Sequence, residues 1–346
     1  MNLAVFLPNW IGDAVMATPA LRALRERYRE GKILGVVKPY VAGLLDGGDW
    51  FDELILADKG PRGQGVLAVA RQLRRRAIDL AVLMPNTLRS ALMAWLGRCR
   101  RRIGYARYGR SPLLTDVLQP IRDEHGRLRP SPIIDAYNLL AVCAGCPPPT
   151  RKMELFTTAA DEAAASWVWE HARLVHYPEI VCLNPGAAFG SAKHWPAEYF
   201  AALARDLATQ RGSGVLVLCG PGERDLARQI VTEACHSAVS TIADAQAAGG
   251  PPLSLGLTKA CVRRADLLVT TDSGPRHFAA AFDRPVVTLF GPTHIAWTET
   301  YFPRALHLQR QVECGPCQRR VCPLDHRCMK RLSPAEVFAA ATSLLS

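Results

Sequence analysis

Short apolar runs alternate with amphipathic segments of helical period along this chain, and this alternation is what most limits its fold. In the first half, an apolar run at residues 3–8 precedes a helix predicted over 17–29, and further pairs follow to about residue 97. Short strands separated by helices are typical of parallel sheets that helices cover. The sequence therefore predicts an α/β fold.

The alternation breaks at a proline-rich stretch and then begins again. Three prolines at 147–149 end a predicted helix, and a new apolar run starts at residue 179. A chain of 346 residues also exceeds what a single hydrophobic core usually holds. We expect two Rossmann-like domains facing across a cleft, over residues 1–155 and 156–346, with the connection between about 150 and 178.

Composition and the absence of targeting signals indicate a cytoplasmic protein. Hydrophobic residues make up 49% of the chain and charged residues 21%, as in soluble globular proteins. Residues 1–5 enter a predicted strand without an export signal, and no run reaches the ~18–20 apolar residues of a membrane-spanning helix. We therefore expect a cytosolic protein whose scattered cysteines are reduced.

The formal charge of +11 indicates either an anionic partner or a solvated basic face. Arginines cluster at residues 74–76, 98–102 and 107–110. Nucleic acid, an anionic lipid surface and a phosphorylated sugar would each match this charge. The sequence contains no helix-turn-helix, zinc-finger or RNA-recognition motif, so a basic nucleic-acid-binding protein is kept only as an alternative.

The sharpest chemical signal follows the apolar run at residues 267–271. Thr271, Asp272, Ser273 and Gly274 lead from this predicted strand into a helix, at the end where open α/β sheets bind ligands. Ser273 would cap the helix, Gly274 would let a ligand approach the backbone, and the exposed N–H groups would attract phosphate. His277 would point to the same place. The alternative is a well-capped helix with an incidental histidine.

Two further strand ends are expected at the same edge of the sheet. Gly186 and Ala187 form a turn after one strand, and Lys193 follows them with a cation suited to a diphosphate leaving group. Glu223 follows another strand, where its carboxylate could accept hydrogen bonds from ribose or sugar hydroxyls. It could equally be an ordinary acidic residue in the first turn of a helix.

In the N-terminal half, residues 8–13 connect the first strand to its helix without the G-x-G-x-x-G phosphate motif. This argues against a nicotinamide enzyme, although a sugar-nucleotide epimerase or another Rossmann oxidoreductase stays an alternative. Asp13 is a candidate general base for an acceptor hydroxyl, because a carboxylate at a strand end can reach into a cleft. It could instead cap the helix.

Four ordered motifs cover most of the chain. They are N-W-I-G-D at 9–13 with P-A-L at 19–21, residues 83–91 with 102–105, N-P-G-A at 184–187 with K-H-W-P at 193–196, and T-D-S-G at 271–274 with His277 and 279–281. Together they resemble the bacterial ADP-heptose:lipopolysaccharide heptosyltransferases of glycosyltransferase family 9, most closely the type II enzymes. The resemblance implies a GT-B architecture, in which the N-terminal domain binds the acceptor and the C-terminal domain binds the nucleotide sugar.

Carried over position by position, the resemblance implies roles for individual residues. Asp13 matches the general base and Lys193 matches the pyrophosphate contact, so these two are the catalytic candidates. Pro275 and Arg276, which follow the glycine, receive no role. The donor-binding candidates are Gly186, Ala187, Glu223, Thr271, Asp272, Ser273, Gly274 and His277, and the acceptor-binding candidates are Asn9, Trp10, Gly12, Asn86, Arg89 and Arg107.

The implied reaction is an inverting transfer of L-glycero-D-manno-heptose from ADP-heptose to the inner core of lipopolysaccharide, with no cofactor required for catalysis. A type I or type III acceptor is the alternative within the family. We expect a monomer without nucleic acid, held peripherally at the inner face of the cytoplasmic membrane, with an acceptor of Kdo-lipid A type. The arginine clusters could guide that anionic acceptor.

Four cysteines near residue 320 stand apart from the scattered ones. Cys314, Cys317, Cys322 and Cys328 have the density of a small structural zinc or iron–sulfur site, with gaps shorter than in common zinc folds. The alternative is a surface loop of reduced thiols. A metal here would be structural, because donor binding does not need it.

Overall fold

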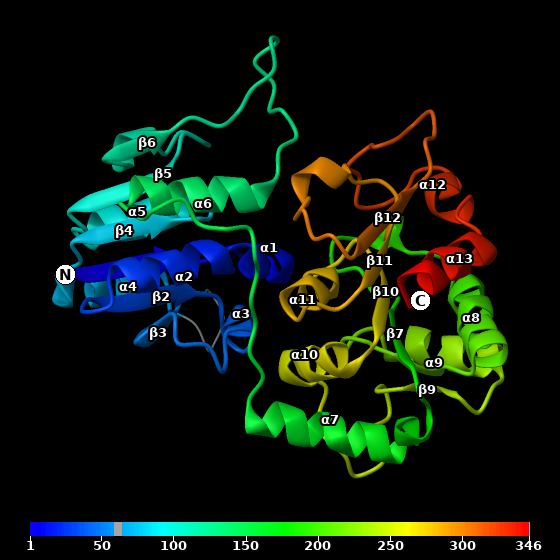
Figure 1. The fold of residues 1–346 in the computed structure, drawn as a ribbon. Helices are drawn as coiled ribbons and strands as arrows, with labels where there is room; N and C mark the ends of the chain where they lie inside the picture. Colours follow the sequence, from blue (N-terminus) through cyan, green and yellow to red (C-terminus); the bar gives the residue numbers. More distant parts are fainter. Residues whose placement is uncertain (59–63, 346) are drawn as a thin grey trace. The chain divides into compact units, whose positions relative to one another are not determined.

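A computed structural model describes residues 1–58 and 64–345, and it divides the chain into two compact units (Figure 1). Unit 1 comprises Met1–Leu155 together with the short segment Ala296–Tyr301. Unit 2 comprises Phe156–Ile295 and the chain from Phe302 onward. The return of residues 296–301 to unit 1 has no signal in the sequence pattern.

Unit 1 is built on a six-stranded, wholly parallel sheet in the order β3-β2-β1-β4-β5-β6. Side chains on both faces of the central strands are buried. These strands therefore have continuous apolar sequences and no alternation of apolar with polar residues. On one face α4 packs beside α5, and elsewhere α2 packs beside α6. The elements are β1 (Asn2–Phe6), α1 (Ile11–Met16), α2 (Thr18–Arg27), β2 (Lys32–Val37), α3 (Pro39–Ala42), β3 (Glu53–Leu56), α4 (Val66–Arg75), β4 (Leu80–Leu83), α5 (Leu88–Leu96), β5 (Arg101–Tyr105), β6 (Asp116–Leu118) and α6 (Ile133–Cys143).

Unit 2 repeats the architecture with the order β12-β11-β10-β7-β8-β9, again wholly parallel. Its helix α7 begins with a capping box, in which Thr158 and Asp161 each bond the other's backbone N–H. The elements are α7 (Ala159–His171), β7 (Ile180–Asn184), α8 (Ala197–Asp206), β8 (Gly214–Val217), α9 (Arg224–Ala234), β9 (Val239–Thr241), α10 (Leu255–Arg264), β10 (Leu267–Thr271), α11 (Pro275–Ala281), β11 (Val286–Phe290), β12 (Ala305–Gln309), α12 (Arg327–Lys330) and α13 (Pro334–Leu345).

Both sheets have the Rossmann strand order, so the predicted α/β class with two Rossmann-like units is confirmed. Counted from the first strand of each unit, the order is 3-2-1-4-5-6 in both cases. Each sheet therefore has a topological switch point, between β1 and β4 in unit 1 and between β7 and β10 in unit 2. Ligands of open α/β sheets bind beside the carboxyl ends of the strands at this point.

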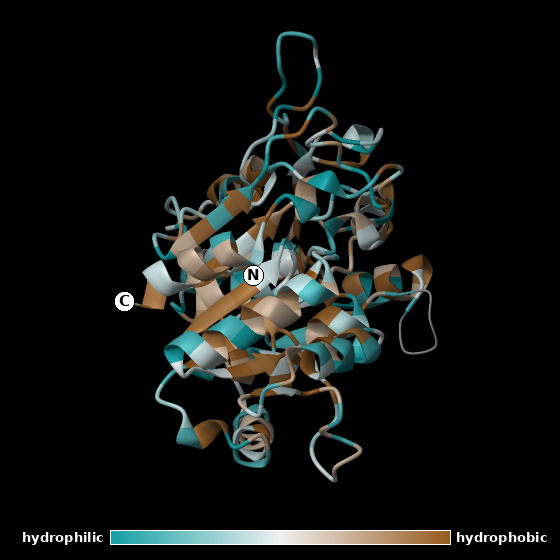
Figure 2. Ribbon diagram, turned by 90° about the vertical axis from the view of Figure 1, so that its right-hand side faces the viewer, coloured by the Kyte–Doolittle hydropathy of each residue, from teal (hydrophilic) through white to brown (hydrophobic). Residues whose placement is uncertain are grey.

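Hydrophobic residues gather in the strands, whereas the loop between β6 and α6 projects from unit 1 and is mostly hydrophilic (Figure 2). Within residues 1–58 and 64–345, no helix is both long and apolar enough to cross a membrane. The helix predicted over 17–29 is confirmed as α2, and a short helix that the sequence did not predict, α1, precedes it and ends at Met16.

A fully buried guanidinium ties together two loops at the carboxyl end of the first sheet. Arg110 donates to the carbonyl oxygens of Tyr105 (2.9 Å) and Pro85, to Oδ1 of Asn86 (3.0 Å) and to Oγ of Ser90 (3.3 Å). Burial lowers the pKa of Arg110 to about 10, so it stays charged at neutral pH. Because one planar group bonds the loops after β4 and β5, it fixes the position of Asn86.

We expect Arg110→Met to lower the thermal unfolding midpoint by about 5–10 °C, since two carbonyls and an amide lose their donor, at a cost of about 2–4 kcal/mol. Circular dichroism melting of the parent and the variant measures this shift. Arg100→Met is the matched control, because the Arg100 side chain is 82% exposed, and its midpoint should stay close to that of the parent. Equal midpoints for Arg110→Met and the parent would contradict the assigned role.

Candidate functional site

The loops after β7 and β10 are bonded to each other at the switch point of unit 2. The Asn184 side-chain amide donates to Thr270 Oγ1 (3.0 Å) and to Ser273 Oγ (2.9 Å). Thr271 Oγ1 donates to the carbonyl oxygen of Gly186 (2.6 Å). The two predicted donor-binding segments, which are separated by more than eighty residues of sequence, are thus brought to one place.

A buried carboxylate with two cations lies at the centre of this place. Lys193 Nζ contacts Asp272 Oδ2 at 2.5 Å and the Asp272 carbonyl oxygen at 2.9 Å. Arg276 Nη1 lies 3.3 Å from Asp272 Oδ1, and Thr293 Oγ1 donates to Oδ2 (2.7 Å). Burial alone would raise the pKa of Asp272, but Lys193 and Arg276 outweigh it and lower the pKa to about 2. Asp272 is therefore ionised at any physiological pH.

His277 is buried beside this cluster and is uncharged. Burial, and then the neighbouring Arg276 cation, hold the pKa of His277 well below its ordinary value. In the part of the chain that the structure describes, its Nδ1 has no hydrogen-bond partner. A neutral imidazole can serve a ligand by hydrogen bonding, but it adds no positive charge to the site.

Glu223 lies against the glycine turn of the donor segment. It occupies the N-cap position of α9, and its Oε2 accepts a hydrogen bond from the Gly220 amide (2.9 Å). A Cβ atom at position 186 would lie 2.2 Å from Glu223 Oε1, so only glycine fits at this position while the carboxylate is in place. This contact brings Gly186, the buried Ala187 and the acidic residue together.

The interpretation of Ser273 as a helix cap is wrong. Gly274 is the N-cap of α11, and as a glycine it has no side chain that could cap the helix. The Ser273 hydroxyl instead accepts from Asn184 and exchanges a hydrogen bond with Thr270 (3.1 Å). A remote partner on β7 has therefore taken the oxygen that a local cap would have used.

The turn that carries Lys193 is held by residues far along the chain. The Ala192 amide donates to the carbonyl oxygen of Arg320 (3.0 Å). The indole N–H of the buried Trp195 donates to the carbonyl oxygen of Leu332 (2.9 Å). The segment around residues 320–332 thus supports the predicted donor-binding segment.

The predicted metal site at the four clustered cysteines is not formed. Cys314, Cys317, Cys322 and Cys328 line one small apolar hollow, but Cys314 and Cys317 are exposed and Cys328 is buried. Among residues 1–58 and 64–345, no three His, Cys, Asp or Glu side chains are arranged to hold a metal ion. A structural zinc site needs its ligands in one tetrahedral shell, and the described cysteine side chains do not form one.

At the switch point of unit 1, predicted acceptor residues follow β1 and β4. Asn9 and Arg89 line a cavity of about 300 Å³ at the carboxyl ends of the strands. Lys38 and Asp58, which sequence reasoning missed, line the same cavity after β2 and β3. Their signal was only that each closely follows a predicted strand. The cavity therefore combines two cations, an amide and a carboxylate.

The other predicted residues of unit 1 do not all lie in this cavity. Trp10, Gly12 and Asp13 lie at the start of α1, with Trp10 as the N-cap, so Asp13 is in the first turn and does not cap the helix. Asn86 accepts from Arg110. Arg107 stacks on Tyr108 and lines a separate, shallow hollow.

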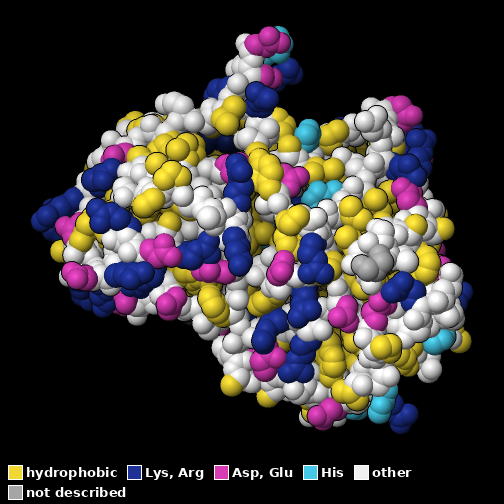
Figure 3. All heavy atoms as spheres, viewed as in Figure 1, with side chains coloured by type: hydrophobic (Ala, Val, Ile, Leu, Met, Phe, Trp, Pro, Cys, Tyr) yellow, Lys and Arg dark blue, Asp and Glu magenta, His cyan; other side chains and the backbone are white. Residues whose placement is uncertain are grey.

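The arginine clusters at residues 74–76 and 98–102 lie away from the strand carboxyl ends. The first cluster precedes β4 and the second ends in the first residues of β5, so both belong to the opposite edge of the parallel sheet. Arg76 pairs with Glu53, Arg100 with Asp79 and Arg101 with Asp116. Figure 3 shows basic and acidic side chains interspersed on the visible surface. Three of the seven arginines in these clusters are therefore paired with carboxylates.

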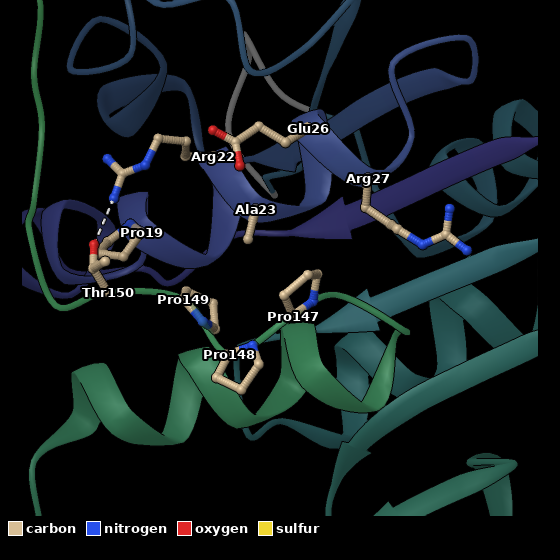
Figure 4. A pocket seen from close by; sticks show the side chains of 9 residues that line it. All are labelled: Pro19, Arg22, Ala23, Glu26, Arg27, Pro147, Pro148, Pro149 and Thr150. Atoms are coloured by element: carbon tan, nitrogen blue, oxygen red, sulfur yellow. Dashed lines mark hydrogen bonds between the residues drawn. The ribbon is translucent and has the colours of Figure 1, made fainter.

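A further cavity of unit 1 contains none of the predicted residues. It measures about 450 Å³ and lies between α2 and the proline-rich segment after α6 (Figure 4). Arg22 donates across it to Thr150 Oγ1 (3.2 Å). Its lining comes from a helix and a loop, not from strand ends.

Known proteins resemble this chain over its whole length. It is 27% identical over 361 residues to lipopolysaccharide heptosyltransferase 2 of Escherichia coli K12, covering 100% of this chain and 99% of that protein. It is 26% identical over 354 residues to lipooligosaccharide heptosyltransferase 2 of Campylobacter jejuni, covering 100% and 98%. The solved structure of E. coli ADP-heptose lps heptosyltransferase II shares the fold with a TM-score of 0.78 at 22% identity, covering 100% of this chain and 98% of that one.

The family described as glycosyltransferase family 9 (heptosyltransferase) matches residues 66–327, which is most of the chain. The match includes the loop after β4 in unit 1 and the Lys193–Asp272 cluster in unit 2. The fold similarity agrees with it and with the predicted GT-B architecture. The chain is therefore a glycosyltransferase that belongs to family 9, the heptosyltransferase family.

Proposed function

We propose that this enzyme transfers L-glycero-D-manno-heptose from ADP-heptose to the inner core of lipopolysaccharide, with inversion at the anomeric carbon. The observation that carries the proposal is the buried Lys193–Asp272–Arg276 cluster at the switch point of unit 2. It supplies cations where a Rossmann-like sheet binds a nucleotide. Relatives along the full length named heptosyltransferase 2 support the choice of donor and acceptor.

In this proposal unit 2 holds the donor. Lys193 binds the diphosphate, and neutral His277 and the backbone around Gly274 add hydrogen bonds. The Glu223 carboxylate, placed beside Gly186, accepts hydrogen bonds from hydroxyls of the ribose. Asp272 holds the Lys193 ammonium in position.

In the proposal, unit 1 binds the acceptor and supplies the general base. The Asp13 carboxylate takes the proton from an acceptor hydroxyl while that oxygen attacks the anomeric carbon. The bond from that carbon to the diphosphate oxygen breaks, ADP leaves, and the transition state has oxocarbenium character. Lys193 stabilises the charge that develops on the leaving diphosphate. The proposed transfer needs no cofactor.

The cavity of unit 1 suits an anionic sugar. Lys38 and Arg89 place two cations against the one carboxylate of Asp58, and Asn9 adds an amide. An acidic core sugar or a core phosphate matches this charge. We infer that the enzyme works as a monomer in the cytoplasm, peripherally at the inner face of the cytoplasmic membrane, where such an acceptor is anchored.

We expect Asp13→Asn to reduce kcat by about 10²–10⁴-fold, because an amide cannot accept the proton of the acceptor hydroxyl. ADP release with ADP-heptose and a heptosylated core acceptor measures the rate. Asp49→Asn is the matched control, since Asp49 is an exposed aspartate of the same unit, and it should keep full activity. Full turnover by Asp13→Asn would remove the proposed base.

We expect ADP to raise the unfolding temperature of the parent and of Asp13→Asn equally, whereas Lys193→Ala should lose most of this shift. The reason is that Lys193 binds the diphosphate and Asp13 serves only the chemistry. Thermal shift with ADP, AMP and UDP measures the effect, with the exposed Lys330→Ala as control.

Two outcomes would favour the rival functions. If the parent gains nothing from ADP but binds DNA with a steep salt dependence, a nucleic-acid-binding protein is indicated. NAD bound to the purified protein would indicate an epimerase or another Rossmann oxidoreductase.

A further inference from the structure

We propose that Arg276 is a positioning residue that allows Lys193 to leave Asp272 for the diphosphate. This inference rests on the proposed function, because it concerns how the same site takes up its nucleotide. Arg276 received no role from the sequence, yet it is 3% exposed and contacts the central carboxylate of the site. In the proposal it keeps that carboxylate neutralised while Lys193 moves.

The two oxygens of Asp272 are divided between the two cations. Oδ2 accepts from Lys193 (2.5 Å) and from Thr293 (2.7 Å), while Oδ1 faces Arg276 (3.3 Å). Each cation therefore has its own oxygen, and neither has to move for the other to bind. Removal of Lys193 from Oδ2 would leave the Thr293 hydroxyl on that oxygen and Arg276 on the other.

The two cations differ in their freedom to move. Arg276 lies in the first turn of α11, and its guanidinium is packed 4.9 Å from the centre of the Phe290 ring. Lys193 ends a short 3-10 turn, and its ammonium lies 4.7 Å from the centre of the Phe189 ring on a flexible four-carbon chain. Lys193 is therefore the cation that can shift, and Arg276 is the one that stays.

A buried carboxylate without a cation is strongly unfavourable. If Lys193 were the sole cation on Asp272, its transfer to a diphosphate would leave such a carboxylate behind. The free energy of diphosphate binding would then be less favourable by the cost of that unpaired charge. With Arg276 in place, Asp272 remains paired throughout. Arg276 thus lowers the cost of diphosphate binding without contacting the ligand.

The proposal predicts a defect that is specific for the diphosphate. Arg276→Gln should weaken ADP binding on the order of tenfold, as is typical of coupling between neighbouring charges, while AMP binding changes less than about twofold. Arg276→Lys should restore most of the ADP affinity. Calorimetry with ADP and AMP measures both constants, and the exposed Arg304→Gln of the same unit is the control and should match the parent.

A double-mutant cycle separates positioning from direct contact. In an Asp272→Asn background no carboxylate holds Lys193, so the further change Arg276→Gln should have little effect on ADP affinity. If Arg276 itself binds the diphosphate, the full tenfold loss would remain in that background, and the proposal would be wrong. Should Asp272→Asn fail to fold, the comparison of ADP with AMP binding by Arg276→Gln still tests the proposal, because equal losses would contradict it.

The ADP and AMP affinities also separate failure of this inference from failure of the proposed function. Equal losses of ADP and AMP affinity in Arg276→Gln would mean a general structural role and would overturn the proposal. Unchanged ADP affinity in Arg276→Gln, with normal binding by the parent, would overturn this inference but leave the proposed function standing. Absence of ADP binding by the parent would instead defeat the proposed function itself.

Discussion

The proposed donor site depends on one buried negative charge. Asp272 lies at the end of β10 with almost no access to water, and its ionised form is stable only because Lys193, Arg276 and Thr293 bond it. The same contacts fix the turn after residue 190 to the end of β10. A single carboxylate therefore sets the local charge and also orders the loops that would receive a nucleotide.

The repeated Rossmann strand order explains why the functional residues fall where they do. In each sheet the order in which successive strands are added reverses beside the first strand. The loops after β1 and β4, and those after β7 and β10, therefore diverge and leave room for a ligand. Each of the four sequence motifs includes residues of one of these loops. The proline-lined cavity beside α2 is larger, but no strand end points a polar side chain into it.

Much of the fold follows from the sequence because the central strands are apolar throughout. The strands β1, β7 and β10 were predicted for that reason. The strands β5, which begins with two arginines, and β12, which is half-buried, were missed, because strands nearer an edge of the sheet need fewer apolar residues. Asp272 and Lys193 were identified individually, but their pairing joins positions 79 residues apart and needs coordinates. Ser273 failed as a cap for the same reason, since its partner Asn184 is remote.

The bonds from Ala192 to Arg320 and from Trp195 to Leu332 have a consequence for how the enzyme is made. Synthesis proceeds from the N-terminus, so unit 1 can begin to fold while later residues are still being added. The turn that carries Lys193, however, cannot form these two hydrogen bonds until residues 320 and 332 have left the ribosome. A nascent chain would thus hold Lys193 in its final position only after residue 332 has left the ribosome.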